Sequence, residues 1–540
     1  MENALNYSYE DLKIVINGKE VYKKGYDLIE FKLESEVNQH TKLILKVKVK
    51  EQYKNEWDVS TKESGSSSIP GERELAFFLH ERKYFAGIIQ RGTTFIRDDN
   101  DMVVELVVCS KSEKMDRDKN YRVYQNPKIR YIDIVKDLLG RHEYITILGV
   151  NRELYSEDSG IDERLSIPMK SSLIVQFDET DWEFLVRIMS HLGIGVFNTE
   201  NGSISLGLSK DVTVNKQWNI TTGNIGRGID KFDNIYYELE SLDFFLLGDN
   251  VIQEQKQNMG YINKVEVECK DGKFYGKYFL RQFEYWFDYI ANAKIKGAKI
   301  DGKVIGVPLI SNKEGVAIMV VNFTFGIKKL VANKEKNRQR DSKNPIKLNA
   351  FNDWISYKEG EGYFYFPYST FYSQTNTGYF CTPQINDVVP INFESDEECE
   401  AFVGFAVDNP KSGRFSDPYY RNYTTHPEEG GESCLFEFSV SRDNYIVECK
   451  NIHKEIFKDK YVEAGDSINV NCDNTISIEN KNAMSVKTET CSLNVTSEYN
   501  ENVDGEKNFS SGGLNEKVSG AKVINCQSYD LTAGSYKISK

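Results

Sequence analysis

The first hundred residues alternate between apolar and polar positions in short runs that polar turns separate. These runs are "LKIVING" (12–18), "LILKVKVK" (43–50), "ELAFFLH" (74–80), "KYFAGIIQ" (83–90) and "DMVVELVVC" (101–109). Successive side chains of a strand point to opposite faces, so each run predicts a half-buried β-strand. Several short strands at this spacing are typical of a small barrel or sandwich. We therefore expect residues 1–110 to form an N-terminal β-barrel domain.

Two later stretches place apolar residues at helical spacing instead. In "YIDIVKDLLGRH" (131–142) the periodic residues are Ile132, Ile134, Val135, Leu138 and Leu139, and Gly140 is a stop signal. In "DETDWEFLVRIMSHLGIGVFN" (178–198) one face carries Trp182, Leu185, Ile188, Met189 and Leu192. Both stretches therefore predict amphipathic helices.

The ends of the second helix are marked by capping residues. Either Asp178 or Thr180 can cap its start, and Glu183 lies three residues after Thr180, as a capping box requires. Gly193 is expected to end the helix, and a hairpin is expected to turn at Asn201-Gly202. Alternation resumes from 205 to about 295, so residues 111–295 predict a second part made of helices plus a β-barrel.

Residues 296–409 carry about five further strand-like runs with glycine-containing turns. This number of strands suits a small closed barrel, which we expect to be OB-like. The basic, polar stretch 330–348 predicts an exposed loop or insertion, and 410–459 is expected to be a connector.

Near the C-terminus, pairs of apolar residues two positions apart recur every eight residues. The first pairs are Ile468/Val470, Ile476/Ile478 and Met484/Val486, with Asn, Ser, Asp, Glu and Lys between them. The register slips by one at Leu493/Val495, is roughly regained at Val503 and is unclear through "GEKNFSSGGLNEK" (505–517). It returns at Ala521/Val523, Tyr529/Leu531 and Tyr536/Ile538. One strand of this kind has too few apolar residues to build a core of its own.

Stacked repeats can bury such pairs jointly. Eight residues are too few for one turn of a single-chain β-helix, whereas three chains with one strand each per layer would close a prism. We therefore predict that 460–540 is an intertwined triple-stranded β-helix in a homotrimer. Its interior would hold the residues Ile468, Val470, Ile476, Ile478, Met484, Val486, Leu493, Val495, Val523, Leu531 and Ile538. The alternative is a polar, partly disordered tail, but the spacing and the absence of proline after Pro427 favour the β-helix.

Composition narrows the possible partners and compartments. The chain has 540 residues, and 68 basic against 82 acidic residues give a net charge of −14, which disfavours binding to nucleic acid or anionic membranes. No apolar run approaches the roughly 20 residues of a membrane-spanning helix, and the first residues do not resemble a secretory signal. The nine cysteines are scattered singly, which indicates reduced thiols in the cytosol. If the protein leaves the cell, we expect another route than the signal peptide.

A search for catalytic or metal-binding patterns returned two weak candidates. His191 lies on the second helix without visible partners and is better explained as structural. The acidic residues Glu394, Asp396, Glu397, Glu398 and Glu400 lack calcium-loop spacing and predict a solvated hairpin. No GxSxG, P-loop, GxGxxG, HExxH or CxxC pattern occurs. The expectation is therefore a protein without enzymatic activity, cofactor or metal.

The order of these parts resembles the VgrG spikes of type VI secretion and the hub and spike proteins of contractile phage tails. The matching stretches are "SEVNQHTKLILKV" (35–47), "KYFAGIIQ" (83–90), "MDRDKNYRVYQN" (115–126) with "YIDIVKDLL", "VQFDETDWEFLVRIMSHLGIGVF" (175–197) and "GYFCTPQINDVVPINFE" (378–394). Together they span nearly the whole chain in the family's order. The family's usual glycine before aspartate is Asn386 here, which changes only a turn residue.

The resemblance implies a structural trimer that sits on the inner tube of an injection machine and pierces a target envelope. It implies as partners an Hcp-like tube protein, baseplate proteins, possible effectors and a separate PAAR-like tip protein, since no histidine follows His453 to hold a metal at the tip. Assembly in the bacterial cytoplasm and delivery by the machine, with only transient membrane puncture, would follow. The alternative function is a trimeric tail fibre that binds or degrades surface polysaccharide through carboxylates and aromatic platforms on its β-helix.

Overall fold

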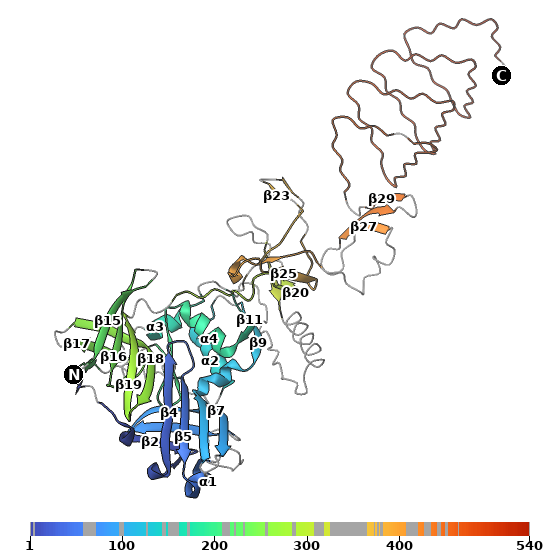
Figure 1. The fold of residues 1–540 in the computed structure, drawn as a ribbon. Helices are drawn as coiled ribbons and strands as arrows, with labels where there is room; N and C mark the ends of the chain where they lie inside the picture. The colour runs from blue at the N-terminus through green and yellow to red at the C-terminus, as the bar shows by residue number, and fades with distance from the viewer. Residues whose placement is uncertain are drawn as a thin grey trace. The chain divides into compact units, whose positions relative to one another are not determined.

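Strands dominate the fold of this protein in the computed structural model (Figure 1). The structure describes residues 2–3, 6–57, 72–96, 102–125, 128–142, 147–148, 161–169, 173–207, 217–220, 223–230, 233–253, 257–282, 288–306, 318–323, 364, 366–371, 373–374, 377–378, 382–406, 420–425, 434–439, 444–448, 452–462 and 464–538. The chain divides into two compact units, Met1–Glu448 and Cys449–Lys540. Each unit is described separately below.

The first unit is built around a largely antiparallel sheet of 14 strands. Along its main path the order is β1-β14-β17-β18-β4-β5-β8-β7-β6-β2-β3, and β19, β16 and β15 branch from β18. The strands are β1 (Glu2–Asn3), β2 (Leu12–Ile16), β3 (Lys19–Glu20), β4 (Tyr26–Glu36), β5 (Lys42–Val49), β6 (Glu74–Leu79), β7 (Arg82–Ile96), β8 (Met102–Cys109), β14 (Gln217–Asn219), β15 (Asn224–Ile229), β16 (Ile235–Ser241), β17 (Asn250–Gln253), β18 (Gln257–Lys270) and β19 (Lys273–Arg281). A short helix, α1 (Lys54–Trp57), follows β5.

The five runs of alternating residues near the N-terminus all lie in strands of this sheet, as predicted. In β5 every second residue is buried, which places Leu43, Leu45 and Val47 in the core and the alternate residues Ile44 and Lys46 on the other face. Burial of alternate apolar side chains is what stabilises a sheet with one solvated face. The alternation in the sequence therefore determined both the strands and their orientation.

Strands from the two expected hub parts, 1–110 and 111–295, share this one sheet. β18 pairs with β4 in antiparallel register, with Val265 opposite Ser35 and Val267 opposite Leu33. Leu33 and Val267 also belong to the same hydrophobic core. The helical segment between them in sequence has a core of its own.

That second core is formed by three helices and short strands. The elements are α2 (Tyr131–Leu139), α3 (Ile161–Ser166), α4 (Asp181–Ser190), β9 (Lys119–Tyr124), β10 (Ile147–Leu148), β11 (Ile174–Thr180), β12 (Val196–Asn198) and β13 (Ile204–Leu206). Both predicted helices are present, α2 ends before Gly140, and β12 and β13 pair around Asn201-Gly202 as expected. α4 ends at Ser190, earlier than predicted, and Gly193 adopts a φ of +63° in the turn that follows.

The start of α4 is capped as the sequence predicted. The Glu183 N–H donates to Thr180 Oγ1 at 3.1 Å, and the Thr180 N–H donates to Glu183 Oε2 at 2.8 Å. This reciprocal pair satisfies donors that the first turn of a helix leaves open. Thr180, and not Asp178, is therefore the capping residue.

A five-stranded barrel follows in the order β22-β21-β20-β25-β26. Its strands are β20 (Lys299–Gly306), β21 (Ile318–Asn322), β22 (Phe366–Pro367), β25 (Val388–Asn392) and β26 (Phe402–Val403). A bridge between Tyr368 and Val403 joins the two ends of this order, so the sheet closes on itself. Asn386 adopts a φ of +78° in the turn before β25, the conformation expected of a glycine substitute. The basic stretch 330–348 lies outside the described residues.

The remaining described strands of the first unit form two small sheets. β23 (Ser373–Gln374) pairs with β24 (Thr377–Gly378), and β27 (Tyr420–Thr425), β28 (Cys434–Ser439) and β29 (Asn444–Glu448) form an antiparallel sheet of three. The latter occupies the expected connector 410–459. In the described part of the chain, no helix has the length and apolar character needed to cross a membrane.

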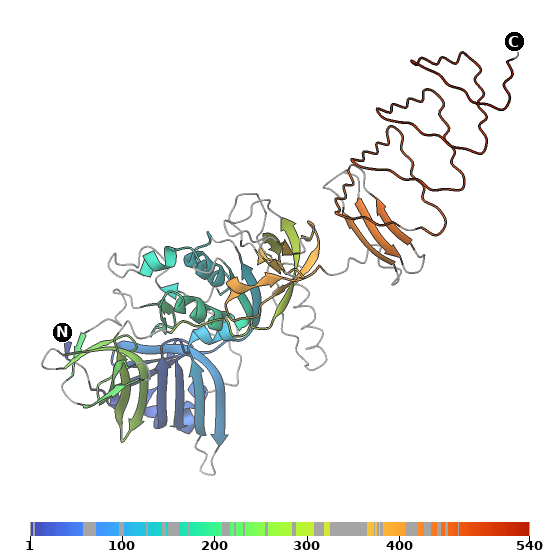
Figure 2. The same cartoon turned by 90° about the horizontal axis from the view of Figure 1, so that it is seen from above.

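The second unit has no regular strand or helix among its described residues, 452–462 and 464–538. Both views show this part as a trace that winds in successive open turns (Figures 1 and 2). Every described residue of it is exposed. The residues that the sequence predicts for the trimer interior lie in this regular but exposed segment.

Candidate functional site: an unpartnered apolar face and a buried polar joint

The winding segment turns at regular intervals. Its bends end at residues 459, 466, 474, 482, 489, 497, 505, 512, 520, 527 and 534, so that seven or eight residues separate each bend from the next. We call the residues from the end of one bend to the end of the next a row. Position 1 of a row is the first residue after a bend, so that Thr475 is position 1 and Ile476 is position 2 of the row that follows residue 474. The period is therefore not a constant eight.

The mixture of seven and eight explains the apparent slip at Leu493. The row that begins after residue 482 has seven residues, so Leu493 stands at position 4 of the next row and Val495 at position 6. Counted from the bends, the earlier pairs such as Ile476 and Ile478 stand at positions 2 and 4. The rows continue without interruption through 505–517, where the sequence pattern was unclear.

Even positions carry nearly all the apolar residues of the rows. Because side chains alternate along an extended chain, positions 2, 4 and 6 share one face. From 466 to 538 this even face holds most of the predicted interior residues: Ile468, Val470, Ile476, Ile478, Met484, Val486, Leu493, Val495, Leu531 and Ile538. The odd positions are Asn, Ser, Thr and charged residues, apart from Val523, Gln527, the alanines Ala483 and Ala521, and the glycines Gly512, Gly513 and Gly534.

Val523 is the one predicted interior residue that stands at an odd position. It occupies position 3 of its row, and its neighbour Ile524 occupies position 4. Val523 is 85% exposed, compared with 52% for Ile524. The bends therefore place Ile524, which the sequence reasoning missed, on the even face.

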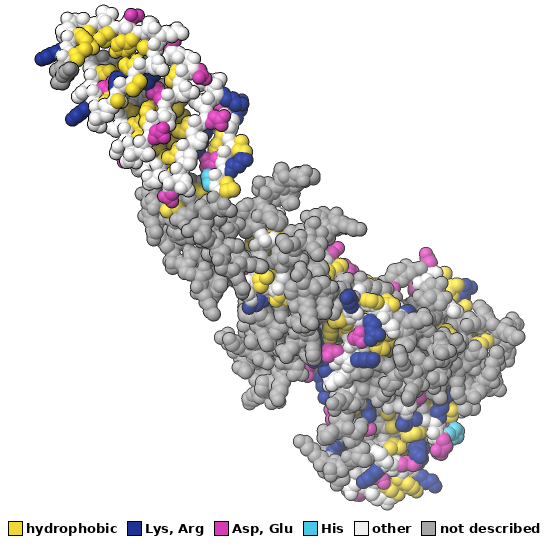
Figure 3. Space-filling model, turned by 180° about the vertical axis from the view of Figure 1, so that it is seen from behind, with side chains coloured by type: hydrophobic (Ala, Val, Ile, Leu, Met, Phe, Trp, Pro, Cys, Tyr) yellow, Lys and Arg dark blue, Asp and Glu magenta, His cyan; other side chains and the backbone are white. Residues whose placement is uncertain are grey.

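The even face has no partner within its own chain. Its eleven predicted residues, with Val523 included, are between 43% and 85% exposed. On the face shown in Figure 3, hydrophobic side chains of this segment gather along the middle of the winding trace, while Lys and Arg lie mainly at its margins. A continuous apolar surface of this kind marks an interaction site.

A buried polar cluster joins the helical part of the first unit to the barrel. Arg187 of α4 donates from Nε to Glu179 Oε1 at 2.7 Å and from Nη1 to Glu398 Oε1 at 2.9 Å. Asn292 Nδ2 donates to Glu398 Oε1 at 3.0 Å and to the Val175 carbonyl at 2.7 Å. All four charged or amide side chains are buried. Burial opposes the charge of Arg187, but the two carboxylates outweigh it and raise the pKa of this guanidinium.

Glu398 corrects one prediction. The acidic stretch from Glu394 to Glu400 was expected to be a solvated hairpin, and Glu394 and Glu400 are exposed. Glu398 is only 1% exposed and pairs with Arg187, so the prediction is wrong for this residue. A signal for the cluster exists in α4, where residues at almost every position from 182 to 189 are apolar. Such a helix is buried all round, so its arginine must find partners.

Apolar contacts reinforce this joint. The barrel core includes Val304, Ile391 and Val403 together with Tyr121, Leu173 and Val175, which belong to β9 or lie in or beside β11. The barrel therefore has part of its core supplied by the helical part of the hub. Since both apolar and ionic contacts cross the joint, the two parts form one folded unit.

A second buried cluster surrounds Asp181 at the start of α4. Arg122 Nη1 donates to Asp181 Oδ1 at 2.5 Å, His142 Nε2 lies 2.7 Å from Oδ2, and Gln176 Nε2 donates to Oδ1 at 3.0 Å. Burial alone would raise the pKa of Asp181, but the hydrogen bond with His142 and the charge of Arg122 hold this pKa well below its usual range. Asp181 is therefore an anchor for β9 and α4 that is ionised at neutral pH.

The other chemical candidates read as structural. His191 is buried, stacks on Tyr289 at a centroid distance of 4.8 Å and lies 3.4 Å from the Tyr131 hydroxyl through Nδ1. In the described part of the chain, no group of three or more His, Cys, Asp or Glu side chains is placed to hold a metal ion. Among the cysteines of that part, Cys109, Cys269, Cys399, Cys472, Cys491 and Cys526 are free thiols.

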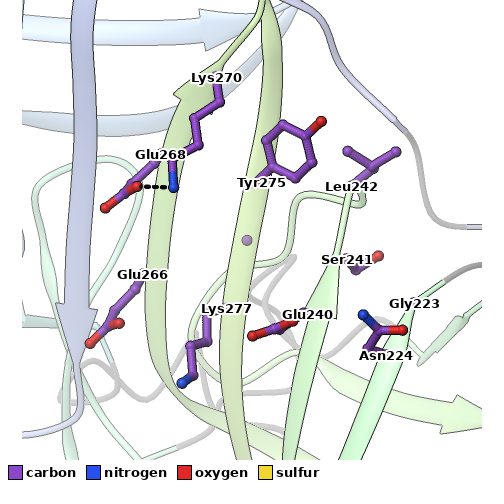
Figure 4. A pocket seen from close by; sticks show the side chains of 11 residues that line it. Gly223, Asn224, Glu240, Ser241, Leu242, Glu266, Glu268, Lys270, Tyr275 and Lys277 are labelled. Atoms are coloured by element: carbon purple, nitrogen blue, oxygen red, sulfur yellow. Dashed lines mark ion pairs between the residues drawn. The ribbon is translucent and has the colours of Figure 1, made fainter.

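A surface hollow of about 680 Å³ lies on the sheet at β15, β16, β18 and β19 (Figure 4). Its wall carries charges of both signs. Glu268 pairs with Lys270 at 2.8 Å, and Glu266 pairs with Lys264 at 2.9 Å beside the hollow. Each pair joins partly exposed residues two positions apart on one face of β18, as the solvated side of a strand allows. The hollow is therefore an ordinary feature of the sheet surface.

Comparison with known proteins identifies the hub. Residues 71–216 match the family model of the phage tail baseplate hub (GPD). This range contains β6 to β13 and the helices α2 to α4, and so includes both polar clusters around α4 except Glu398 and Asn292. This part of the chain is therefore similar to the hub at the baseplate of phage tails. The predicted resemblance to the hub proteins of contractile tails is thereby confirmed for these residues.

Several solved structures are similar to parts of this chain at low sequence identity. The Escherichia coli c3393 protein, a component of the type VI secretion system, is 13% identical, with a TM-score of 0.45 over 73% of this chain and 100% of that one. The VgrG-containing Francisella PdpA–VgrG complex in its half-lidded form gives 10% identity, a TM-score of 0.41, and coverage of 81% and 87%. The 43 kDa tail protein of prophage MuSo2 from Shewanella oneidensis is 8% identical, with a TM-score of 0.36 over 51% of this chain and 98% of that one. A comparison with curated proteins found no match.

Proposed function

We propose that this protein acts as a homotrimer whose second unit is a rigid needle formed by three intertwined chains. The observation that carries this proposal is the even face of the rows, which is apolar, regular and without a partner in its own chain. Each bend redirects the chain, and three copies can close a prism in which each contributes one row per layer. The even faces would then bury one another, and the unpaired row backbones would find partners in neighbouring chains.

Within this proposal the interior consists of the predicted residues with Ile524 in place of Val523. The hub would sit on an Hcp-like inner tube among baseplate proteins, and the needle would carry effectors or a PAAR-like tip protein to the target envelope. Its work would be mechanical and would need no catalysis or cofactor. Assembly in the bacterial cytoplasm and delivery by the machine belong to the same proposal.

The aromatic residues of the needle argue against the polysaccharide-binding alternative. Tyr461, Tyr499, Phe509, Tyr529 and Tyr536 all stand at even positions. Sugar-binding platforms would have to stand on the odd, outward face, where the side chains are mostly small and polar. The alternative therefore lacks the surface that it needs.

Light scattering on the purified chain tests the proposal directly. We expect a mass three times that of the 62.1 kDa chain. A folded monomer would overturn the proposal. A chain that ends after Lys460 should lose the heat and detergent resistance of the trimer. Full resistance of this truncated chain would show that the rows do not hold the trimer together.

A further inference from the structure

Four charged residues interrupt the even face of the needle. Between 466 and 538 they are Glu501, Lys507, Glu516 and Lys522, while every other even position is apolar, a cysteine or a small polar residue. Glu501 and Glu516 stand at position 4 of their rows, and each lysine stands at position 2 of the row that follows. The arrangement thus repeats after two rows.

The structure joins these four residues into two ion pairs. Lys507 Nζ lies 2.5 Å from Glu501 Oε2, and Lys522 Nζ contacts Glu516 Oε2. Each pair connects one row to the next across a bend, at residues 504–505 and 519–520. The Tyr499 hydroxyl also donates to Glu501 Oε2 at 3.2 Å, from position 2 of the same row. Two pairs with the same row positions and the same connectivity form a repeated motif.

Their neighbours keep these charges on the apolar face. Glu501 lies between Tyr499 and Val503, both even residues of the same row. Glu516 lies in the same way between Leu514 and Val518. Because faces alternate, a row cannot turn its glutamate outward without also exposing the apolar residues on both sides.

We propose that the two Glu–Lys pairs lie inside the trimer as ionic layers that set the axial register of the three chains. This inference rests on the proposed homotrimer. In register, three carboxylates of one layer would face three ammonium groups of the next, twice along the needle, so that each buried charge has a partner. The occupant of this face is a second and third copy of the same chain.

Apolar rows by themselves do not define the register. Since the rows repeat every seven or eight residues, a chain displaced by one row still meets apolar residues of its neighbours. The same displacement carries each Glu–Lys pair along with its chain, but it moves Glu501 or Lys522 to a layer in which the other two chains have only uncharged side chains. That residue then loses the counter-charges that the neighbouring chains supplied. Buried polar residues set the register of coiled coils by the same penalty.

The test compares two lysines of the full-length chain. Lys507→Met leaves Glu501 unpaired on the even face, and Lys517→Met removes the same charge from odd position 5 of a neighbouring row. We expect the first change to lower the melting midpoint of the trimer by more than about 5 °C and the second to leave it within about 1 °C. Equal midpoints for the two variants would place the pairs on the outer surface and overturn the inference.

Two further variants keep the test decisive if Lys507→Met does not fold. The double variant Glu501→Leu/Lys507→Leu removes both charges and should restore the melting midpoint, because apolar pairs can replace buried ion pairs. Replacing all four residues by leucine should retain the trimer but loosen its register. Limited proteolysis with mass spectrometry would then give staggered C-terminal fragments instead of one boundary. A double variant as weak as Lys507→Met, or a single boundary in the fourfold variant, would contradict the proposed role.

The failure of this inference differs from the failure of the proposed function. If light scattering finds no trimer for the unaltered chain, the needle itself is wrong. If the trimer forms but Lys507→Met and Lys517→Met behave alike, only the ionic layers are wrong.

Discussion

Arg187 and Glu398 form a buried ion pair although 211 residues separate them in sequence, with Nη1 and Oε1 2.9 Å apart. The pair connects helix α4 of the hub to the turn between β25 and β26 of the barrel. Asn292 and the Val175 amide also contact the same carboxylate oxygen, so the turn is held at several points. In the proposed spike, force would pass between the hub and the parts that follow the barrel in sequence, so this joint would help to transmit it.

Removing one partner of this cluster should destabilise the first unit strongly. Arg187→Met leaves the carboxylates of Glu179 and Glu398 buried without their counter-charge, so we expect a loss of about 3–5 kcal/mol in the free energy of unfolding. Urea unfolding followed by tryptophan fluorescence would measure it. Arg130→Met is the control, because its pair with Asp133 is exposed and such pairs contribute at most about 1 kcal/mol. Equal losses would show that the buried cluster is not a structural joint.

The Asp181 cluster predicts a loss of stability in acid. The pKa of Asp181 is lower in the folded chain than in the unfolded one, so its ionised form stabilises the fold above the unfolded value of about 4. That contribution should disappear progressively as the pH falls below about 4 towards the folded pKa. Unfolding free energies measured from pH 7 to pH 3 would show the decline.

Asp181→Asn should be less stable at pH 7 and should depend less on pH below 4. Asp118→Asn provides the control, since Asp118 is exposed on the same part of the hub. If Asp181→Asn shows the same acid dependence as the unaltered chain, another group is responsible.

Alternate residues within one row should respond oppositely to a charge. Ile476→Asp would place three carboxylates inside the proposed trimer, whereas Ser477→Asp would place them on its outer face. We expect the first variant to lose its detergent-resistant trimer and the second to keep it, since an unpaired buried charge is costly. Gel mobility without boiling, together with light scattering, would measure both. Similar behaviour of the two variants would mean that the even face of the rows is not buried in a trimer interior.

The adjacent residues Val523 and Ile524 test the phase of the rows. The eight-residue pattern in the sequence selects Val523, whereas the bends place Ile524 on the even face. We therefore expect Ile524→Asp to weaken the trimer and Val523→Asp to be tolerated, with the melting midpoint as the measure. The reverse result would restore the original assignment and contradict the numbering by bends.

Local patterns were sufficient for many individual elements of the first unit. The strand β5 and the capped helix α4 follow from alternation and from Thr180 with Glu183, which act over a few residues. The burial of Glu398 could not be predicted in this way. Its partner Arg187 lies in another part of the chain, and a run of acidic residues ordinarily indicates a solvated turn.

For the C-terminal unit, the sequence by itself determined that apolar residues lie on one face of a repeating extended chain, because neighbouring side chains alternate. Only the tertiary structure decided where each row begins, since bends after seven and after eight residues look like slips in a constant repeat. It also decided that the parts of the hub share a sheet and that Arg187 reaches Glu398. Periodicity is encoded by neighbours in sequence, whereas these pairings depend on how distant segments pack.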